Sequence, residues 1–179
     1  AYAYFNLVRA FGRIPIVDSV LTSDQLASLR QSESQDVYEF MADDLDYAIS
    51  VLPVSYPSGY AGRITVYTAM AIKAKVMMYA GDWDQVASLA DGIISSGRFG
   101  LLADFREVFS IAGENGRESL FEIQSSTLGN VNGNAPYMEY AYIQGPRGNS
   151  PANLQGWGFC TPSEDLISFF DSRGEVVRP

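Results

Sequence analysis

The sequence contains no histidine and only one cysteine, Cys160. The absence of histidine excludes Ser-His-Asp and Cys-His catalysis, zinc sites with histidine ligands and a histidine pH switch. A single cysteine excludes an internal disulfide and a cysteine cluster for a metal ion. We therefore expect neither a metal nor a cofactor, and we interpret Cys160 as a small packed hydrophobic residue.

Basic residues and long apolar runs are also scarce. Lysine and arginine number 12 against 21 aspartates and glutamates, which gives a net charge of −9. Nucleic acids and anionic lipid surfaces attract basic proteins, so neither is expected as a partner, whereas a neutral ligand is compatible with this charge. No stretch approaches the roughly 18 apolar residues of a transmembrane helix. Because the sequence starts inside a helical pattern without a visible signal peptide, we expect an internal fragment.

The segment 62–97 predicts two amphipathic helices, over 65–80 and 82–96, joined by a tight turn. Thr65 is a favourable N-cap for the first helix, and Gly81 ends it because glycine readily adopts the left-handed conformation of a helix end. A helix pair with an aromatic residue just after the turn is the unit of tetratricopeptide-type repeats. Such repeats form scaffolds and binding surfaces more often than catalytic pockets.

The second helix of this pair has its own start signal and its own apolar face. Asp82 caps it, and Gln85 stands three positions later, where a capping-box partner belongs. We expect Trp83 to pack between the helices because it directly follows the turn. The predicted apolar face consists of Trp83, Val86, Ala87, Ala90, Ile93 and Ile94.

An apolar stripe predicts another helix over 34–52, capped either by Ser32 with Gln35 or by Ser34 alone. We interpret its acidic run as a solvated face, with a cation site as the alternative. The stripe consists of Val37, Phe40, Met41, Leu45, Ala48, Ile49 and Leu52, and the acidic run of Asp43, Asp44 and Asp46.

Shorter helical patterns occur elsewhere. Residues 1–11 predict the end of a helix that Gly12 terminates, and single helical turns are expected near 24–29 and over 104–109. A last helix begins at Ser163. The first helix is expected to have Tyr4, Leu7, Val8 and Phe11 on one side, and the last one to have Leu166, Ile167, Phe169 and Phe170 as its apolar side.

The pattern changes after residue 112. Residues 119–124 alternate in the manner of a strand, and 125–162 are rich in glycine and asparagine. An irregular segment of this length in a compact domain is usually functional or disordered, and its aromatic residues argue against disorder. We therefore predict a single domain over 1–179, with a helical scaffold over 1–112, a loop-rich region over 113–162 and a helix over 163–173.

The loop-rich region holds the candidate ligand-binding residues. Aromatic rings stack on the apolar faces of sugars, and planar polar groups bind paired hydroxyls. The alternative for Trp157 is that it anchors the loop on the helical core. Outside this region, we expect Arg63 to form a salt bridge or a cap rather than to bind a ligand carboxylate. The candidates are Tyr137, Tyr140, Tyr142, Trp157, Arg147 and Asn149.

Several motifs occur together and in order along the chain. They are Phe11-Gly12-Arg13-Ile14-Pro15, Gly62-Arg63-Ile64-Thr65, Ala71-x-x-Ala74-Lys75-Val76, Tyr79-x-Gly81-Asp82-Trp83, Glu118-Ser119-Leu120-Phe121-Glu122-Ile123-Gln124, Gly156-Trp157-Gly158, Pro162-Ser163-x-x-Leu166 and Asp171-x-Arg173. With these motifs the chain resembles the SusD/RagB-like family of outer-membrane nutrient-binding lipoproteins, from about residue 4 to residue 173.

The resemblance implies a mostly α fold of tetratricopeptide-like helix pairs, arranged in an α-α superhelix, with a long loop-rich region and at most short strands. It also implies a protein without catalytic activity on the surface of the outer membrane of Bacteroidetes-type bacteria. Such a protein binds oligosaccharides and delivers them to a partner TonB-dependent SusC-like transporter. Membrane attachment is expected only through a lipid anchor outside this chain. A peptide-binding member of the same family is the alternative.

A carboxylate-based glycoside hydrolase is a further alternative, because a pair of carboxylates hydrolyses glycosides without histidine. Glu122 and Glu139 are the candidate pair. Glu122 lies in the predicted strand, and no pocket-forming pattern supports the pairing. We therefore expect no catalytic residue and no enzymatic activity.

Overall fold

The computed structural model describes residues 1–57, 59–60, 62–124, 147, 157–159 and 161–174. The chain forms two compact units, Ala1–Glu122 and Ile123–Pro179. The described residues are mostly helical and contain no strand, only an isolated antiparallel bridge between Ile14 and Ser32. This confirms the predicted mostly α class. The predicted single domain, with its scaffold, loop-rich region and last helix, stays a prediction. No helix in the described part of the chain has the length and apolar character needed to cross a bilayer.

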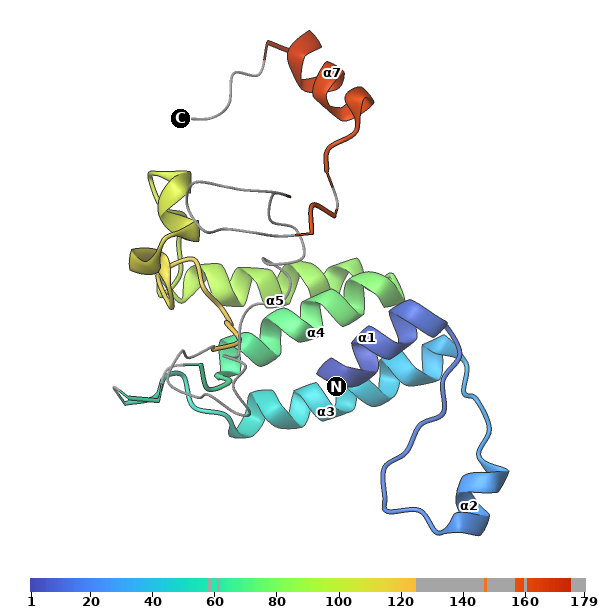
Figure 1. Cartoon of the computed structure of the whole chain (residues 1–179). Coiled ribbons are helices and arrows are strands. Elements are labelled where there is room, and N and C mark those ends of the chain that lie inside the picture. Colours follow the sequence, from blue (N-terminus) through green and yellow to red (C-terminus); the bar gives the residue numbers. More distant parts are fainter. Residues whose placement is uncertain (58, 61, 125–146, 148–156, 160, 175–179) are drawn as a thin grey trace, which may run out of the picture. The chain divides into compact units, whose positions relative to one another are not determined.

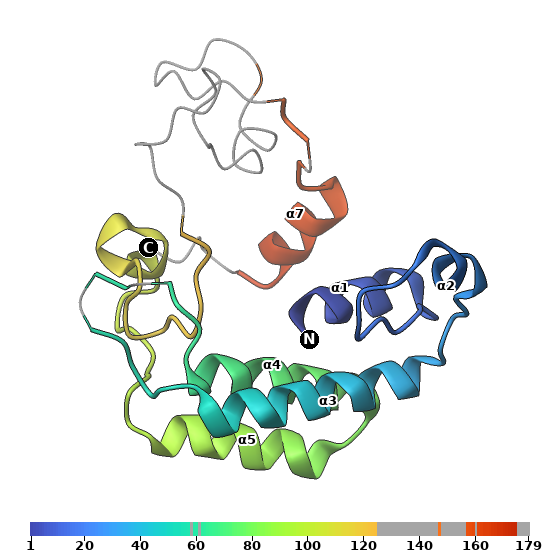
Figure 2. The same cartoon turned by 90° about the horizontal axis from the view of Figure 1, so that it is seen from below.

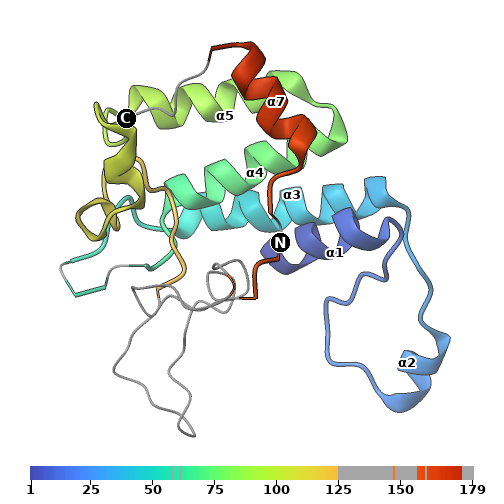
Figure 3. The ribbon, with the colours of Figure 1, turned by 45° about the horizontal axis from the view of Figure 1, so that its top comes forward.

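Three helices form the body of the first unit: α3 (Ser34–Val51), α4 (Val66–Ala80) and α5 (Trp83–Ser95). Each reverses the direction of the one before it, and α1 (Tyr2–Phe11) lies against α3 (Figures 1 and 3). The short helix α2 (Ser23–Ser28) sits on the connection between α1 and α3, away from α3, α4 and α5 (Figures 1 and 3). The predicted helix pair and the predicted turn near 24–29 are therefore confirmed.

The turn between α4 and α5 follows from local chemistry. Gly81 adopts the left-handed conformation, with φ 84° and ψ 11°, and the Asp82 N–H donates to the Met77 carbonyl at 3.0 Å. Asp82 caps α5 by accepting the Gln85 N–H at 3.0 Å. Because the Asp82 N–H is already used, the Gln85 side chain binds the Asp82 carboxylate instead, at 2.6 Å. At the start of α4, Thr65 and Thr68 form a reciprocal capping box.

The core of the first unit lies where α1, α3 and α4 meet. The face predicted for α1 is partly wrong, because Leu7 and Phe11 are exposed whereas Phe5 is buried, with its ring edge-on to Tyr79. Helical periodicity does not decide which of two neighbouring stripes on a short helix meets its partner. The buried core consists of Phe5, Val8, Ile14, Val37, Met41, Leu45, Ala69, Val76 and Met77.

The packing predicted for α5 also needs correction. Trp83 is 63% exposed and Ile94 is 70% exposed, so neither is a core residue. Val86 and Ile93 of the predicted face are confirmed, with Val86 packed against the core and Ile93 buried, and Leu89, which the pattern does not indicate, also packs against the core. Trp83 is the first residue of α5 and directly follows the turn, at one end of the helix pair.

The predicted caps of α3 are wrong as well. Glu33 takes the N-cap position without a side-chain cap bond. The Ser32 N–H donates to the Ile14 carbonyl at 2.9 Å, and the Glu33 carboxylate pairs with Arg13 at 3.0 Å. The backbone bridge therefore fixes the chain just before α3, and the Glu33 carboxylate pairs with Arg13 instead of capping the helix.

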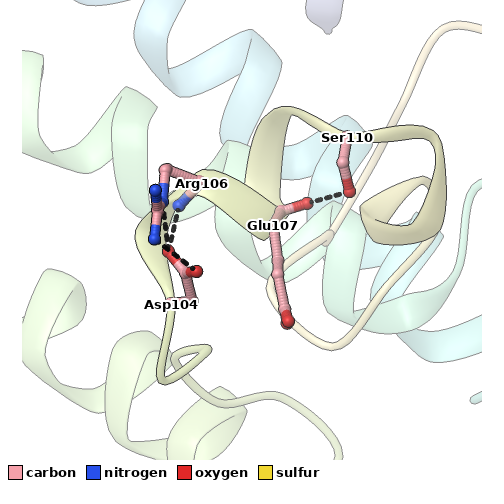
Figure 4. Close-up of polar contacts among 4 residues, drawn as sticks. All are labelled: Asp104, Arg106, Glu107 and Ser110. Carbon is pink, nitrogen blue, oxygen red and sulfur yellow. Dashed lines mark hydrogen bonds and ion pairs between the residues drawn. The ribbon is translucent and has the colours of Figure 1, made fainter. Parts of the chain in front are cut away.

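Two short 3-10 helices, η1 (Phe105–Phe109) and η2 (Ile111–Gly113), follow α5. Asp104 caps η1 through the Arg106 N–H and also holds the Arg106 guanidinium (Figure 4). The predicted turn over 104–109 is thus confirmed. In the second unit, α7 (Glu164–Ser172) begins after its N-cap Ser163, as expected, and its apolar residues are about half exposed.

The strand predicted over 119–124 is wrong, since the structure assigns no regular element to these residues. Their polar groups are bound locally and to α4. The Leu120 carbonyl accepts the buried Thr68 hydroxyl at 2.7 Å, and the Glu122 carboxylate accepts from the Asn115 N–H at 2.9 Å and from the Ser119 hydroxyl. One hydrogen bond joins the segment to α4, and Ile123 is 75% exposed, so the alternating pattern does not correspond to a covered face here.

Candidate functional site

Two of the six predicted ligand-binding residues, Arg147 and Trp157, belong to the part of the chain that the structure describes. The structure brings these two together. The other four lie outside the described residues and stay predictions: Tyr137, Tyr140, Tyr142 and Asn149.

Arg147, Trp157 and Phe159 form a cluster in the second unit, which we call the Trp157 cluster. The Arg147 Nε donates to the Trp157 carbonyl, and its guanidinium carbon lies 5.7 Å from the centre of the Phe159 ring. The rings of Trp157 and Phe159 are nearly parallel, with planes 3° apart and centres 6.4 Å apart. Both rings are about half exposed, so each presents apolar surface to the solvent.

Gly158 makes this arrangement possible. Its φ is 63°, which a side chain rarely adopts, and a Cβ there would lie 2.9 Å from Cγ of Arg147. The glycine thus allows the Arg147 stem to pass close to the backbone between the two aromatic residues. The alternative interpretation, in which Trp157 anchors the loop on the helical core, stays a prediction.

Phe159 was not among the predicted site residues. The available signal was its position two residues after Trp157 in the same short aromatic segment, with a glycine between them that permits a left-handed turn of the backbone. Together, the cluster offers two apolar ring faces and one planar cation. This is the combination that binds the apolar face and the hydroxyl groups of a sugar.

A second candidate site is a cavity of about 590 Å³ in the first unit, which we call the arginine cavity. It lies among the loop between α3 and α4 and the segment that follows α5, which run beside one another (Figures 1 and 2). Arg63, Arg98 and Arg117 line it. The Arg63 guanidinium carbon lies 4.4 Å from the centre of the Tyr60 ring and 5.7 Å from that of Tyr56.

Arg63 therefore differs from its predicted role. No salt bridge to it is found among the described residues, and aromatic rings hold its guanidinium in place of a carboxylate or a helix end. Arg98 is placed in a similar way, 6.0 Å from the centre of the Tyr67 ring. Such cation–π contacts leave the N–H groups of an arginine available to a ligand.

Two of the acidic residues considered as reactive or cation-binding groups, Glu122 and Asp46, are engaged in structural contacts. Glu122 binds Asn115 and Ser119, while its proposed hydrolase partner, Glu139, lies outside the described residues. Asp46 pairs with the buried Lys73 of α4 at 2.6 Å. One member of the acidic run of α3 thus connects two helices, and so the run is not uniformly a solvated face.

Comparison with known proteins gives consistent relatives. No family model matches the chain. The SusD-like protein P2 of Formosa agariphila is 29% identical over 180 residues, which cover 97% of this chain and 35% of that protein. A SusD-like protein of Bacteroides ovatus is 26% identical over 142 residues, covering 72% of this chain and 25% of that protein. The chain thus spans about a third or less of the length of these curated relatives.

Solved structures share the fold. Surface glycan-binding protein A from Bacteroides thetaiotaomicron, in complex with laminarihexaose, matches with a TM-score of 0.76 and 26% identity, covering 93% of this chain and 37% of that one. A laminarin binding SusD-like protein matches with a TM-score of 0.85 and 24% identity, covering 96% of this chain and 41% of that one. The likeness to the latter establishes the helical fold.

Proposed function

Starting from the SusD/RagB-like family that these similarities support, we propose that the chain is part of a protein that binds oligosaccharides without catalysing a reaction on them. The Trp157 cluster is the observation that carries the proposal. It presents two nearly parallel, half-exposed rings beside a guanidinium group. Sugar rings pack their C–H faces on such aromatic surfaces, and their hydroxyl groups bind to planar polar groups.

The charge of the chain and the relatives agree with this ligand. A neutral oligosaccharide is not repelled by a net charge of −9. The structural relative from Bacteroides thetaiotaomicron, which is 26% identical, was solved with laminarihexaose, a neutral glucan oligomer. Laminarihexaose is therefore a suitable first probe for this chain.

The cellular role follows from the family. The whole protein sits on the surface of the outer membrane, held by a lipid anchor outside this chain, and delivers the bound oligosaccharide to a TonB-dependent SusC-like transporter. The Trp157 cluster supplies part of the ligand contacts. The alternative is that the protein is a peptide-binding member of the same family, and the binding experiment distinguishes the two.

Calorimetric titration of the chain with laminarihexaose tests the proposal. We expect Trp157→Ala to weaken binding at least about tenfold, because a lost stacking contact of about 1.4 kcal/mol changes the dissociation constant by that factor. Phe159→Ala should weaken binding less, since phenylalanine has the smaller ring. The matched control is Trp83→Ala, which removes an exposed tryptophan of similar accessibility from the first unit.

Two results would overturn the proposal. Laminarihexaose and other neutral oligosaccharides could fail to bind while a neutral peptide library binds, which would establish the peptide alternative. Alternatively, Trp83→Ala could weaken binding as much as Trp157→Ala does, which would remove the site from the Trp157 cluster. Circular dichroism of each variant separates loss of binding from loss of folding.

A further inference from the structure

The arginine cavity has a charge opposite to that of the chain. The whole sequence carries 12 basic and 21 acidic residues. The cavity, in contrast, is lined by three arginines and a single acidic residue, Glu122. That carboxylate already accepts hydrogen bonds from Asn115 and Ser119. The cavity therefore gathers positive charge in a chain whose net charge is −9.

The three guanidinium groups have no carboxylate partner in the part of the chain that the structure describes. Among the described residues, no carboxylate lies within ion-pair distance of Arg63, Arg98 or Arg117. Arg106 shows the contrast, because it lies in η1 outside the cavity and its guanidinium binds the Asp104 carboxylate at 3.3 Å (Figure 4). The cavity therefore keeps cationic donors available, although acidic residues are abundant elsewhere in the chain.

Aromatic contacts restrict two of these arginines. Arg63 lies over Tyr60 at 4.4 Å, and Arg98 lies 6.0 Å from the ring centre of Tyr67, whose ring in turn meets Phe99 edge-on at 5.4 Å. Holding a guanidinium in place lowers the conformational entropy that is lost when it binds a ligand. Guanidinium groups bind carboxylates and sulfate-like oxyanions through paired N–H donors.

The size and the lining of the cavity favour a sugar that carries an acidic substituent over a small free anion. A volume of about 590 Å³ exceeds that of a single carboxylate or sulfate and is typical of a small-molecule site. Tyr56, Tyr60 and Phe99 line the same cavity as the arginines. Aromatic rings beside oxyanion-binding groups suit a charged sugar ring, which has an apolar face and an acidic substituent.

We infer that the arginine cavity binds an anionic sugar unit of an oligosaccharide, recognising its carboxylate or sulfate group through Arg63, Arg98 and Arg117. This inference rests on the proposed function and extends it: the chain takes acidic oligosaccharides at a site distinct from the Trp157 cluster. The affinity of this site falls with ionic strength, whereas binding of a neutral oligosaccharide does not.

Calorimetric titration of the chain with a galacturonic acid hexamer and a sulfated oligosaccharide of equal length tests the inference. Arg98→Gln and Arg117→Gln should each weaken binding of the charged probes about tenfold, as expected for the loss of a charge-assisted hydrogen bond. Arg98→Lys keeps the charge without the planar fork and should have an intermediate affinity. Arg106→Gln, which removes the same charge outside the cavity, should have little effect. The tighter of the two probes identifies the preferred anionic group.

Three outcomes would overturn the inference: neither charged probe binds, Arg106→Gln weakens binding as much as Arg98→Gln, or a hexaglutamate peptide binds as tightly as the sugar acids. Laminarihexaose carries no charge, so its binding and its dependence on Trp157 report the proposed function separately. If the charged probes do not bind at the cavity, the laminarihexaose result still stands. If laminarihexaose does not bind at the Trp157 cluster, the result with the charged probes still stands. Unaltered circular dichroism confirms that each variant is folded.

Discussion

At the residue scale, the pair of Lys73 and Asp46 shows how a charge is accommodated in this fold. Lys73 of α4 is 7% exposed, and its ammonium group lies 2.6 Å from a carboxylate oxygen of Asp46 on α3. Burying an ammonium without a partner costs free energy, and so the carboxylate stabilises the contact between the two helices. Part of this gain is screened, because the Asp46 side chain is 60% exposed.

Asp46→Ala should lower the free energy of unfolding by about 1–2 kcal/mol, because it leaves the Lys73 ammonium without its partner. Chemical denaturation measures this loss. In a Lys73→Met background the same substitution should cost little, since no buried charge remains. Asp43→Ala, at an exposed position on the same helix, is the control. Equal losses in both backgrounds would show that the pair contributes nothing.

Asp82 shows a second residue-level effect, a shifted pKa. Hydrogen bonds from the backbone N–H and the side chain of Gln85, helped by the charge of Lys73, lower the pKa of Asp82 below its ordinary value of 3.8. The folded state therefore holds its proton less tightly than the unfolded state. The resulting stabilisation is fully present above pH 3.8 and is lost as the pH falls through the lower, folded pKa.

Asp82→Asn should reduce this pH dependence, because asparagine still caps the helix but does not titrate. Thermal unfolding of the two proteins between about pH 5 and about pH 2 measures the difference. We expect the wild-type protein to lose more stability over this range than the variant. Identical pH profiles would contradict the role assigned to the Asp82 carboxylate.

At the element scale, the α4–α5 pair shows which features a sequence predicts well. Caps and turns depend on residues close in sequence, and so Thr65, Gly81 and Asp82 were assigned correctly. The exposure of Trp83 and the irregular course of 119–124 depend on which distant surfaces are available. Local patterns do not contain that information.

Gly81→Ala should lower the free energy of unfolding by about 1–2 kcal/mol through the left-handed backbone alone. A Cβ at this position meets nothing within 4 Å, so a steric clash does not contribute. Asparagine tolerates this conformation better, and Gly81→Asn should therefore be the milder change. Denaturation of both variants measures the order, and an alanine variant as stable as the wild-type protein would contradict it.

At the scale of the whole molecule, the two candidate sites differ in how far the sequence predicts them. Arg147 and Trp157 were predicted because they belong to one short aromatic and polar segment, and the structure adds Phe159 from the same segment. The arginine cavity was not predicted. Arg63 comes from the loop between α3 and α4, whereas Arg98 and Arg117 come from the segment that follows α5, and only the folded chain brings these two segments to one cavity.

The central claim is that the Trp157 cluster receives a sugar ring. The chain has two tryptophans, both exposed, so their fluorescence can be separated by substitution. Trp83→Phe leaves Trp157 as the sole tryptophan, and its emission should shift and saturate during titration with laminarihexaose. Trp157→Phe leaves only Trp83, whose emission should stay unchanged. A response from the Trp83-only protein, together with none from the Trp157-only protein, would contradict the claim.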